Sequence, residues 1–75
     1  MDRSFYRFVL SFRGGVKGDL NSLFAEAMFN DLGFPKEEKA FDLLSRYIED
    51  KADSQMSSVL FDELYRLYEE RFPQQ

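Results

Sequence analysis

Aromatic residues recur along this chain at the spacing of a helix face. Its 75 residues include nine phenylalanines and four tyrosines. In the first segment, Phe5, Phe8, Val9 and Phe12 fall at positions i, i+3, i+4 and i+7, which places them on one face of an α-helix. Because each buried aromatic side chain removes roughly 150–250 Å² from water, repeated stripes of this kind can close a small core. The pattern therefore predicts an all-α domain held together by aromatic packing.

Local residues indicate where four such helices begin and end. Ser4, Asp19 and either Ser57 or Ser58 stand where a helix N-cap belongs. Pro35 can occupy a first helical position, since its fixed φ angle suits a helix start. Glycines at 14, 15 and 33 and the proline at 73 mark helix ends. The predicted helices span about 4–13, 19–32, 35–51 and 57–72.

These helices are expected to form one domain, 1–75, with an ordered core over about 4–72. The apolar face of the second predicted helix starts at Leu20 and points inward, and the inward face of the third predicted helix includes Ala52. Leu43 and Tyr47 broaden the third apolar face, so we expect the third helix to be central. The residues predicted to form the core are Phe5, Phe8, Phe12, Phe24, Phe41, Leu44, Ile48, Phe61, Leu64 and Tyr68.

Two phenylalanines allow more than one interpretation. Phe29 lies opposite the apolar stripe of its helix, so either that helix packs on two sides, which we favour, or Phe29 is exposed. Phe34 precedes Pro35 and Lys36 in a turn. We favour a buried Phe34 that fills the space between the second and third helices. The alternative is an exposed aromatic and basic corner that recognises a partner.

Composition removes several functional classes. The chain has no cysteine and no histidine, which excludes disulfides, Cys/His zinc sites and haem ligation by either residue. No segment reaches the roughly 18 apolar residues of a membrane span. The first residues lead directly into the amphipathic pattern, unlike a signal peptide. We therefore expect a cytoplasmic protein with no cofactor, no metal and no membrane partner.

Charge is distributed unevenly along the chain. The net charge is −4, which disfavours binding to a phosphate backbone. Residues 1–18 carry four basic and one acidic side chain, whereas residues 19–75 carry six basic and thirteen acidic ones. This asymmetry is either chance among solvated helix faces or a basic surface with a function. Under the second interpretation, the candidate interaction surface is Arg7, Arg13, Lys17 and Phe29.

Catalytic motifs are absent from the sequence. Without histidine, the most common general acid–base residue is missing. The acidic pairs 37–38 and 69–70 diverge by about 100° on a helix, so neither pair converges on a substrate. The glycine run at 14–18 follows a helix and lacks the G-K-[ST] ending of a phosphate loop. We therefore expect a non-enzymatic interaction module that binds a protein or a second copy of itself. Nucleic-acid binding through the basic first helix is the alternative.

Short motifs spread along nearly the whole chain, residues 4–70, together match the pattern of one protein family. They are Ser4-Phe5-Tyr6 with Leu10 and Arg13, Phe24-Ala25 with Phe29 and Asp31, Phe34-Pro35-Lys36, Ser45 with Tyr47 and Glu49, and Phe61-Asp62-Glu63 with Tyr68. This combination resembles the YozE-like proteins, small bacterial proteins of uncharacterised function. The resemblance implies a sterile-alpha-motif-like fold, a compact bundle of four to five short helices. The chain departs from the family in its glycine-rich first loop, where proline is common, and at Tyr65, where tryptophan is common. Sterile-alpha-motif-like folds bind proteins, RNA or DNA, so the fold alone does not choose a function.

Overall fold

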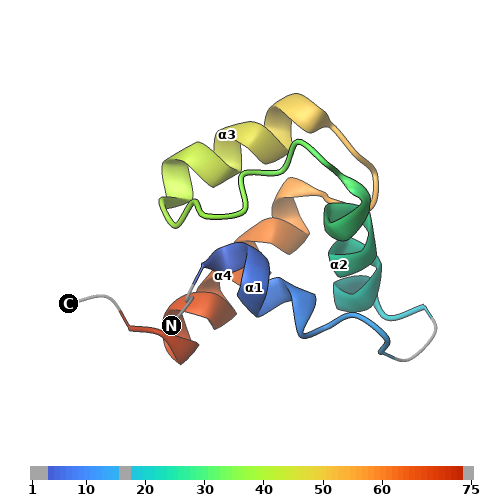
Figure 1. The fold of residues 1–75 in the computed structure, drawn as a ribbon, viewed down its shortest axis with the longest axis horizontal. Helices are drawn as coiled ribbons and strands as arrows, with labels where there is room; N and C mark the ends of the chain where they lie inside the picture. Colours follow the sequence, from blue (N-terminus) through green and yellow to red (C-terminus); the bar gives the residue numbers. More distant parts are fainter. Residues whose placement is uncertain (1–3, 16–17, 74–75) are drawn as a thin grey trace.

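A computed structural model describes residues 4–15 and 18–73 (Figure 1). All regular secondary structure within these two ranges is α-helical, as the sequence predicts. The helices are α1 (Phe5–Leu10), α2 (Leu20–Asn30), α3 (Phe41–Lys51) and α4 (Ser58–Arg71). The aromatic stripes therefore specify the correct number and order of helices, although each helix is shorter than its predicted span.

The central helix is α4, which packs against each of the other three helices. In contrast, α3 packs against α4 alone among the described helices (Figure 1). The prediction that the third helix is central is therefore wrong. The reason lies in the number of side chains that each helix buries. α3 buries Leu44 and Ile48, whereas the longer α4 buries Phe61, Leu64, Tyr65 and Tyr68.

Three predicted N-caps are confirmed. The side-chain oxygens of Ser4, Asp19 and Ser57 each accept a hydrogen bond of 3.2 Å from a backbone N–H two or three residues further along. Such a bond satisfies one of the N–H groups that have no partner within the helix. These caps explain why α1, α2 and α4 begin at the residues that the sequence indicates.

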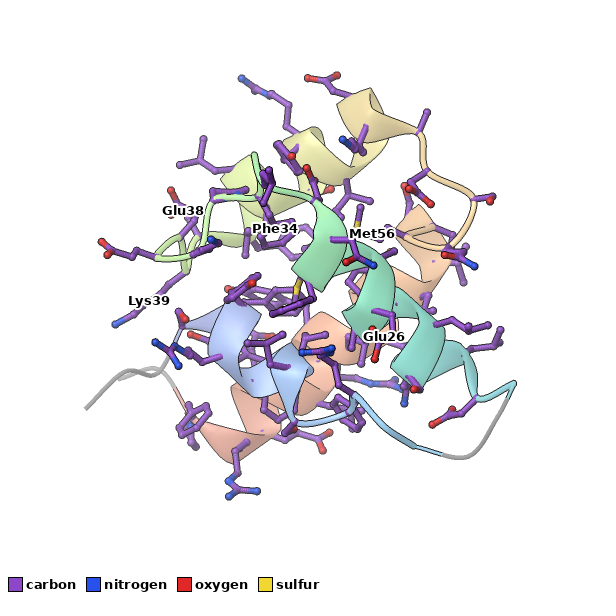
Figure 2. All side chains as sticks on the ribbon, turned by 45° about the vertical axis from the view of Figure 1, so that its right-hand side comes forward. Glu26, Phe34, Glu38, Lys39 and Met56 are labelled. Carbon is purple, nitrogen blue, oxygen red and sulfur yellow. The ribbon has the colours of Figure 1, made fainter. Side chains whose placement is uncertain are left out.

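The third helix begins at Phe41 and not at Pro35. The carbonyl oxygen of Pro35 accepts a hydrogen bond of 3.2 Å from the backbone N–H of Glu38, which closes a turn. The Glu38 carboxylate then accepts hydrogen bonds from the backbone N–H groups of Lys39 and Ala40, at 3.1 and 3.0 Å. These local bonds compete with helical ones. Figure 2 shows Glu38 and Lys39 at the edge of the molecule. Proline and acidic residues therefore build a turn here instead of a helix start.

Aromatic rings form the centre of the core. The Phe5 ring lies 5.2 Å from the Phe61 ring and 5.7 Å from the rings of both Tyr65 and Tyr68, measured between centroids. Aromatic pairs at such distances stabilise a fold beyond the area that they bury. Phe8 and Phe12 are only partly buried and pack against this core. The predicted core residues that are confirmed as buried are Phe5, Phe24, Leu44, Ile48, Phe61, Leu64 and Tyr68.

Phe41 is the predicted core residue that the structure places at the surface. It is 41% exposed, because it is the first residue of α3 and stands at the rim of the core. Its ring still contacts those of Phe61 and Tyr65, at 5.5 and 5.1 Å between centroids. At the other end of α3, Ala52 is exposed in a left-handed conformation with φ 52°. The third stripe is therefore shorter than its periodicity indicates.

Two buried residues lie in the segments between helices. Phe34 is only 3% exposed, and its ring contacts those of Tyr6 on α1 and Tyr47 on α3, at 5.7 and 5.4 Å (Figure 2). Its burial is confirmed, and the exposed recognition corner is wrong. Met56 is also buried, although it lies in the otherwise polar segment 53–57 before α4. A single large apolar residue in a polar segment was the available indication that this loop folds over the core.

Candidate functional site

Arg13 and Phe29 form a pair on the outer face of α2. Phe29 is 43% exposed, so the favoured packing of α2 on two sides is wrong. The Arg13 guanidinium carbon lies 3.7 Å from the centre of the Phe29 ring, and Arg13 Nε donates a hydrogen bond of 3.1 Å to Glu26 Oε2. The Arg13 side chain therefore covers Phe29 and ties the segment after α1 to α2. Such half-exposed pairs stabilise a fold by at most about 1 kcal/mol.

Arg7 lies elsewhere, in a cleft between α1 and the end of α4. This cleft has a volume of about 250 Å³ and is lined by Arg7, Phe8, Ser11, Arg71 and Phe72. Arg13 does not line it. The structure therefore does not bring the predicted residues Arg7, Arg13 and Phe29 into one surface. The fourth predicted residue, Lys17, lies outside the described residues.

A more apolar groove lies where the first turns of α2 and α4 meet the loop before α4. It has a volume of about 300 Å³. Its lining residues are Leu20, Leu23, Ser54, Gln55, Ser57, Val59, Leu60 and Glu63. We call this the α2–α4 groove. None of the predicted surface residues lines it, so the sequence analysis missed it.

Two strongly exposed aliphatic side chains line the α2–α4 groove. Leu20 is 65% exposed and Val59 is 72% exposed, because each lies in the first turn of its helix, where no other element covers it. The prediction that Leu20 points inward is therefore wrong. Val59 lies off the stripe of Phe61, Leu64, Tyr65 and Tyr68 that α4 buries, as do Leu60 and Leu67. These positions were the indication in the sequence of a second apolar face.

Acidic residues adjoin the α2–α4 groove. Glu63 is the only charged residue among the described residues that line it. Asp19 and Asp53 directly precede the lining residues Leu20 and Ser54. No described lysine or arginine lines the groove, so its described lining carries one negative charge and no positive one.

Asp31 holds together the end of α2, the following turn and α3. Its carboxylate accepts hydrogen bonds from the Tyr47 hydroxyl at 2.5 Å, the Gly33 N–H at 3.1 Å and Lys51 Nζ at 3.3 Å. The Asp31 side chain is 7% exposed. Burial raises its pKa, but these hydrogen bonds, with the charge of Lys51, together lower it below 3.8. Burial, the hydrogen bond to Asp31 and the carboxylate charge raise the pKa of Tyr47 to about 12. Every polar group in this cluster has a partner, which is typical of a structural role.

Metal binding and membrane insertion find no support in the described parts of the chain. No group of three or more aspartates and glutamates there is placed to hold a metal ion. None of the four helices is long and apolar enough to cross a membrane. The α2–α4 groove and the cleft that contains Arg7 remain candidate surfaces for function.

The fold and the comparisons agree on the class of protein. Four short helices with α4 packed against the other three form an all-α, sterile-alpha-motif-like domain. The family model described as the YozE SAM-like fold matches residues 4–70, and the chain belongs to this family. The resemblance seen in the sequence is therefore confirmed.

Bacterial relatives align over most of the chain. A UPF0346 protein of Staphylococcus haemolyticus is 49% identical over 69 residues, covering 89% of both chains. One of Staphylococcus saprophyticus is 48% identical and covers 92% of both. One of Geobacillus thermodenitrificans is 41% identical and covers 91% of this chain and 94% of its own. No solved structure gives a significant match. The relatives' names specify no ligand or reaction, so function must be argued from the surfaces.

Proposed function

We propose that this chain is a non-enzymatic cytoplasmic module that binds a segment of another protein in the α2–α4 groove. The observation that carries the proposal is the exposure of Leu20 and Val59 along one apolar groove. Contiguous exposed apolar surface on a small domain is typical of an interaction site. The described residues that line the groove include no convergent set of acidic, basic and nucleophilic groups, which supports binding rather than catalysis.

Burial of the two exposed side chains supplies the driving force. Complete burial of a valine or leucine side chain is worth about 1.5–3 kcal/mol. Since Leu20 and Val59 are mostly exposed, covering both would contribute about 2–4 kcal/mol before the costs of association. This contribution suits a transient partner whose affinity depends on further contacts at the groove edge.

Charge indicates the chemistry of the partner. The acidic surroundings of the groove favour a basic residue in the segment that binds, beside two or three apolar side chains at helical spacing. Two copies of a chain with net charge −4 repel each other. We therefore assign the groove to a different protein and not to a second copy.

Nucleic-acid binding receives less support from the same surfaces. Arg13, one of the basic residues on which that alternative relied, is paired with Glu26. The α2–α4 groove is acidic, and a phosphate backbone would be repelled from it. Nucleic acid remains an outcome that the following experiment can detect.

Site-specific photo-crosslinking in bacterial cells tests the proposal. A photo-reactive phenylalanine analogue is placed at Val59, and the crosslinked material is digested and identified by mass spectrometry. The matched control carries the analogue at Leu43, which is 52% exposed on α3 and lines neither the α2–α4 groove nor the cleft that contains Arg7. We expect Val59 and not Leu43 to crosslink to one reproducible protein segment that contains apolar and basic residues.

Other results would contradict the proposal in distinguishable ways. Equal crosslinking from both positions would mean that the groove has no preference. A crosslinked peptide from this chain itself would identify a second copy as the occupant, and crosslinked nucleic acid would favour the alternative. Leu20→Ser should reduce the specific product at least about fivefold, since it removes an apolar contact. Leu43→Ser should leave that product unchanged.

A further inference from the structure

Glu63 is the one charged residue among the described residues that line the α2–α4 groove. Its side chain is exposed and forms no hydrogen bond or ion pair with any other described residue. By contrast, the carboxylates of Glu26, Asp31 and Glu38 accept hydrogen bonds within the fold. The charge of Glu63 is therefore not engaged by the described part of the chain and is available to a partner.

The groove has a fixed order along α4. Val59 and Glu63 are four residues apart, which places them on the same face of the helix, about 6 Å apart along its axis. Leu60, three residues before Glu63, also lines the groove, and Leu20 and Leu23 line it from α2. An apolar position is therefore followed by an acidic one, one helical turn further along α4.

The remaining described residues of the lining carry no charge. Ser54 and Gln55 are neutral, and the Ser57 hydroxyl accepts a hydrogen bond of 3.2 Å from the backbone N–H of Leu60. Within the described lining, selection by charge therefore depends on Glu63. When a partner covers the neighbouring aliphatic side chains, it displaces water from around this carboxylate. The attraction of the carboxylate to a positive charge then becomes stronger.

A helical segment suits this groove better than an extended one. Extended segments often bind by adding a strand to the edge of a sheet, and residues 4–15 and 18–73 form no strand. A helix instead packs its side chains between those of α2 and α4. On such a helix, side chains three or four residues apart lie about 5–6 Å from each other. This distance matches the separation of Val59 and Glu63 along α4.

We propose that Glu63 determines which partner binds, by pairing with an arginine or lysine on a helical segment of another protein. This basic residue lies three or four residues from the apolar side chain that covers Val59. Arginine is the better match, because its planar guanidinium donates two parallel hydrogen bonds to a carboxylate. The inference rests on the function proposed for the groove. It adds the residue that sets specificity and the spacing that a partner must carry.

Selection from a displayed peptide library against the purified full chain tests this inference. Each library member is a segment of strong helix formers with one fixed central leucine. Random residues occupy the positions two, three and four residues to either side of that leucine. Tiled segments of this chain itself are included in the same library. We expect arginine and lysine to be enriched at a position three or four residues from the leucine.

Three variants of the chain locate this preference. Glu63→Gln should abolish the enrichment of basic residues while apolar peptides are still recovered, since it removes a charge and no described contact. Glu70→Gln is the matched control, because Glu70 is exposed on the same helix and does not line the groove. It should leave the enrichment unchanged. Val59→Ser should reduce total recovery at least about fivefold, since it removes an apolar contact.

Fluorescence anisotropy then measures the pair directly. The most enriched peptide is compared with the same peptide in which citrulline, a neutral analogue of similar shape, replaces arginine. At low salt, the arginine peptide should bind the unmodified chain about fivefold more tightly, near the upper limit for an exposed ion pair. Both peptides should bind the Glu63→Gln variant equally, and the Glu70→Gln variant should keep the fivefold difference.

The possible failures separate this inference from the proposed function. Basic residues that stay enriched with Glu63→Gln, or that are enriched two residues from the leucine as in an extended segment, would contradict the inference. Loss of recovery with Val59→Ser without any enrichment of basic residues would contradict the role of Glu63 and leave the groove as a binding site. Recovery that Val59→Ser does not affect, or no recovery at all, would contradict both. Enrichment of a segment of this chain would identify a second copy as the occupant and would also contradict both.

Discussion

Phe61 and Phe41 provide a direct test of how the core is organised. Their ring centroids lie 5.5 Å apart, yet Phe61 is fully buried and Phe41 is 41% exposed. Phe61→Ala should cost about 3–5 kcal/mol of stability, since it leaves a cavity among the rings of the core. Phe41→Ala should cost about 1–2 kcal/mol, because about three-fifths of the residue's surface is buried and water can fill the space left at the rim.

Urea unfolding followed by far-ultraviolet circular dichroism measures both losses. A domain of 75 residues has a total stability of about 4–11 kcal/mol, and its urea dependence is about 1 kcal/mol per molar. The unfolding midpoint should therefore fall by at least about 3 M for Phe61→Ala and by about 1–2 M for Phe41→Ala. The substitutions are chemically identical, so each controls for the other. Equal losses, or a larger loss at Phe41, would refute the assignment of Phe41 to the rim.

Three further predictions concern the loops and α3. The pKa of Asp31 is lowered in the folded protein, so the Asp31 carboxylate should stabilise the fold fully above pH about 3.8 and lose this effect as the pH falls through its folded pKa. The urea midpoints of the wild type and Asp31→Asn should therefore converge in acid. The pKa of Tyr47 is raised to about 12 in the folded protein, so the contribution of its hydroxyl group to the free energy of unfolding should be lost as the pH rises from about 10 to 12. Tyr47→Phe should not show this loss of stability at high pH. Ala52→Gly should raise the unfolding free energy by about 0.5–1 kcal/mol in the urea assay, since Ala52 has φ 52°. A lower midpoint for this variant would contradict the reasoning.

Helix positions could be predicted from the sequence where two local properties agreed. In α1, α2 and α4, an apolar stripe begins next to a serine or aspartate that caps the helix. Before α3, proline and two glutamates are typical of a helix start but are equally suited to a turn. Tertiary contacts decide between the two, since Phe34 must reach Tyr6 and Tyr47 before α3 begins. Periodicity alone contains no information about these contacts.

The candidate sites were less accessible to sequence reasoning because each is made of segments far apart in the chain. Proximity in sequence suggested that Arg7 and Arg13 form one basic surface. Instead, Arg13 pairs with Glu26 on α2, whereas Arg7 shares a cleft with Arg71 on α4. Net charge also gave no indication of a basic cleft at the end of the most acidic helix. These pairings depend on how the helices cross, which residue spacing does not specify.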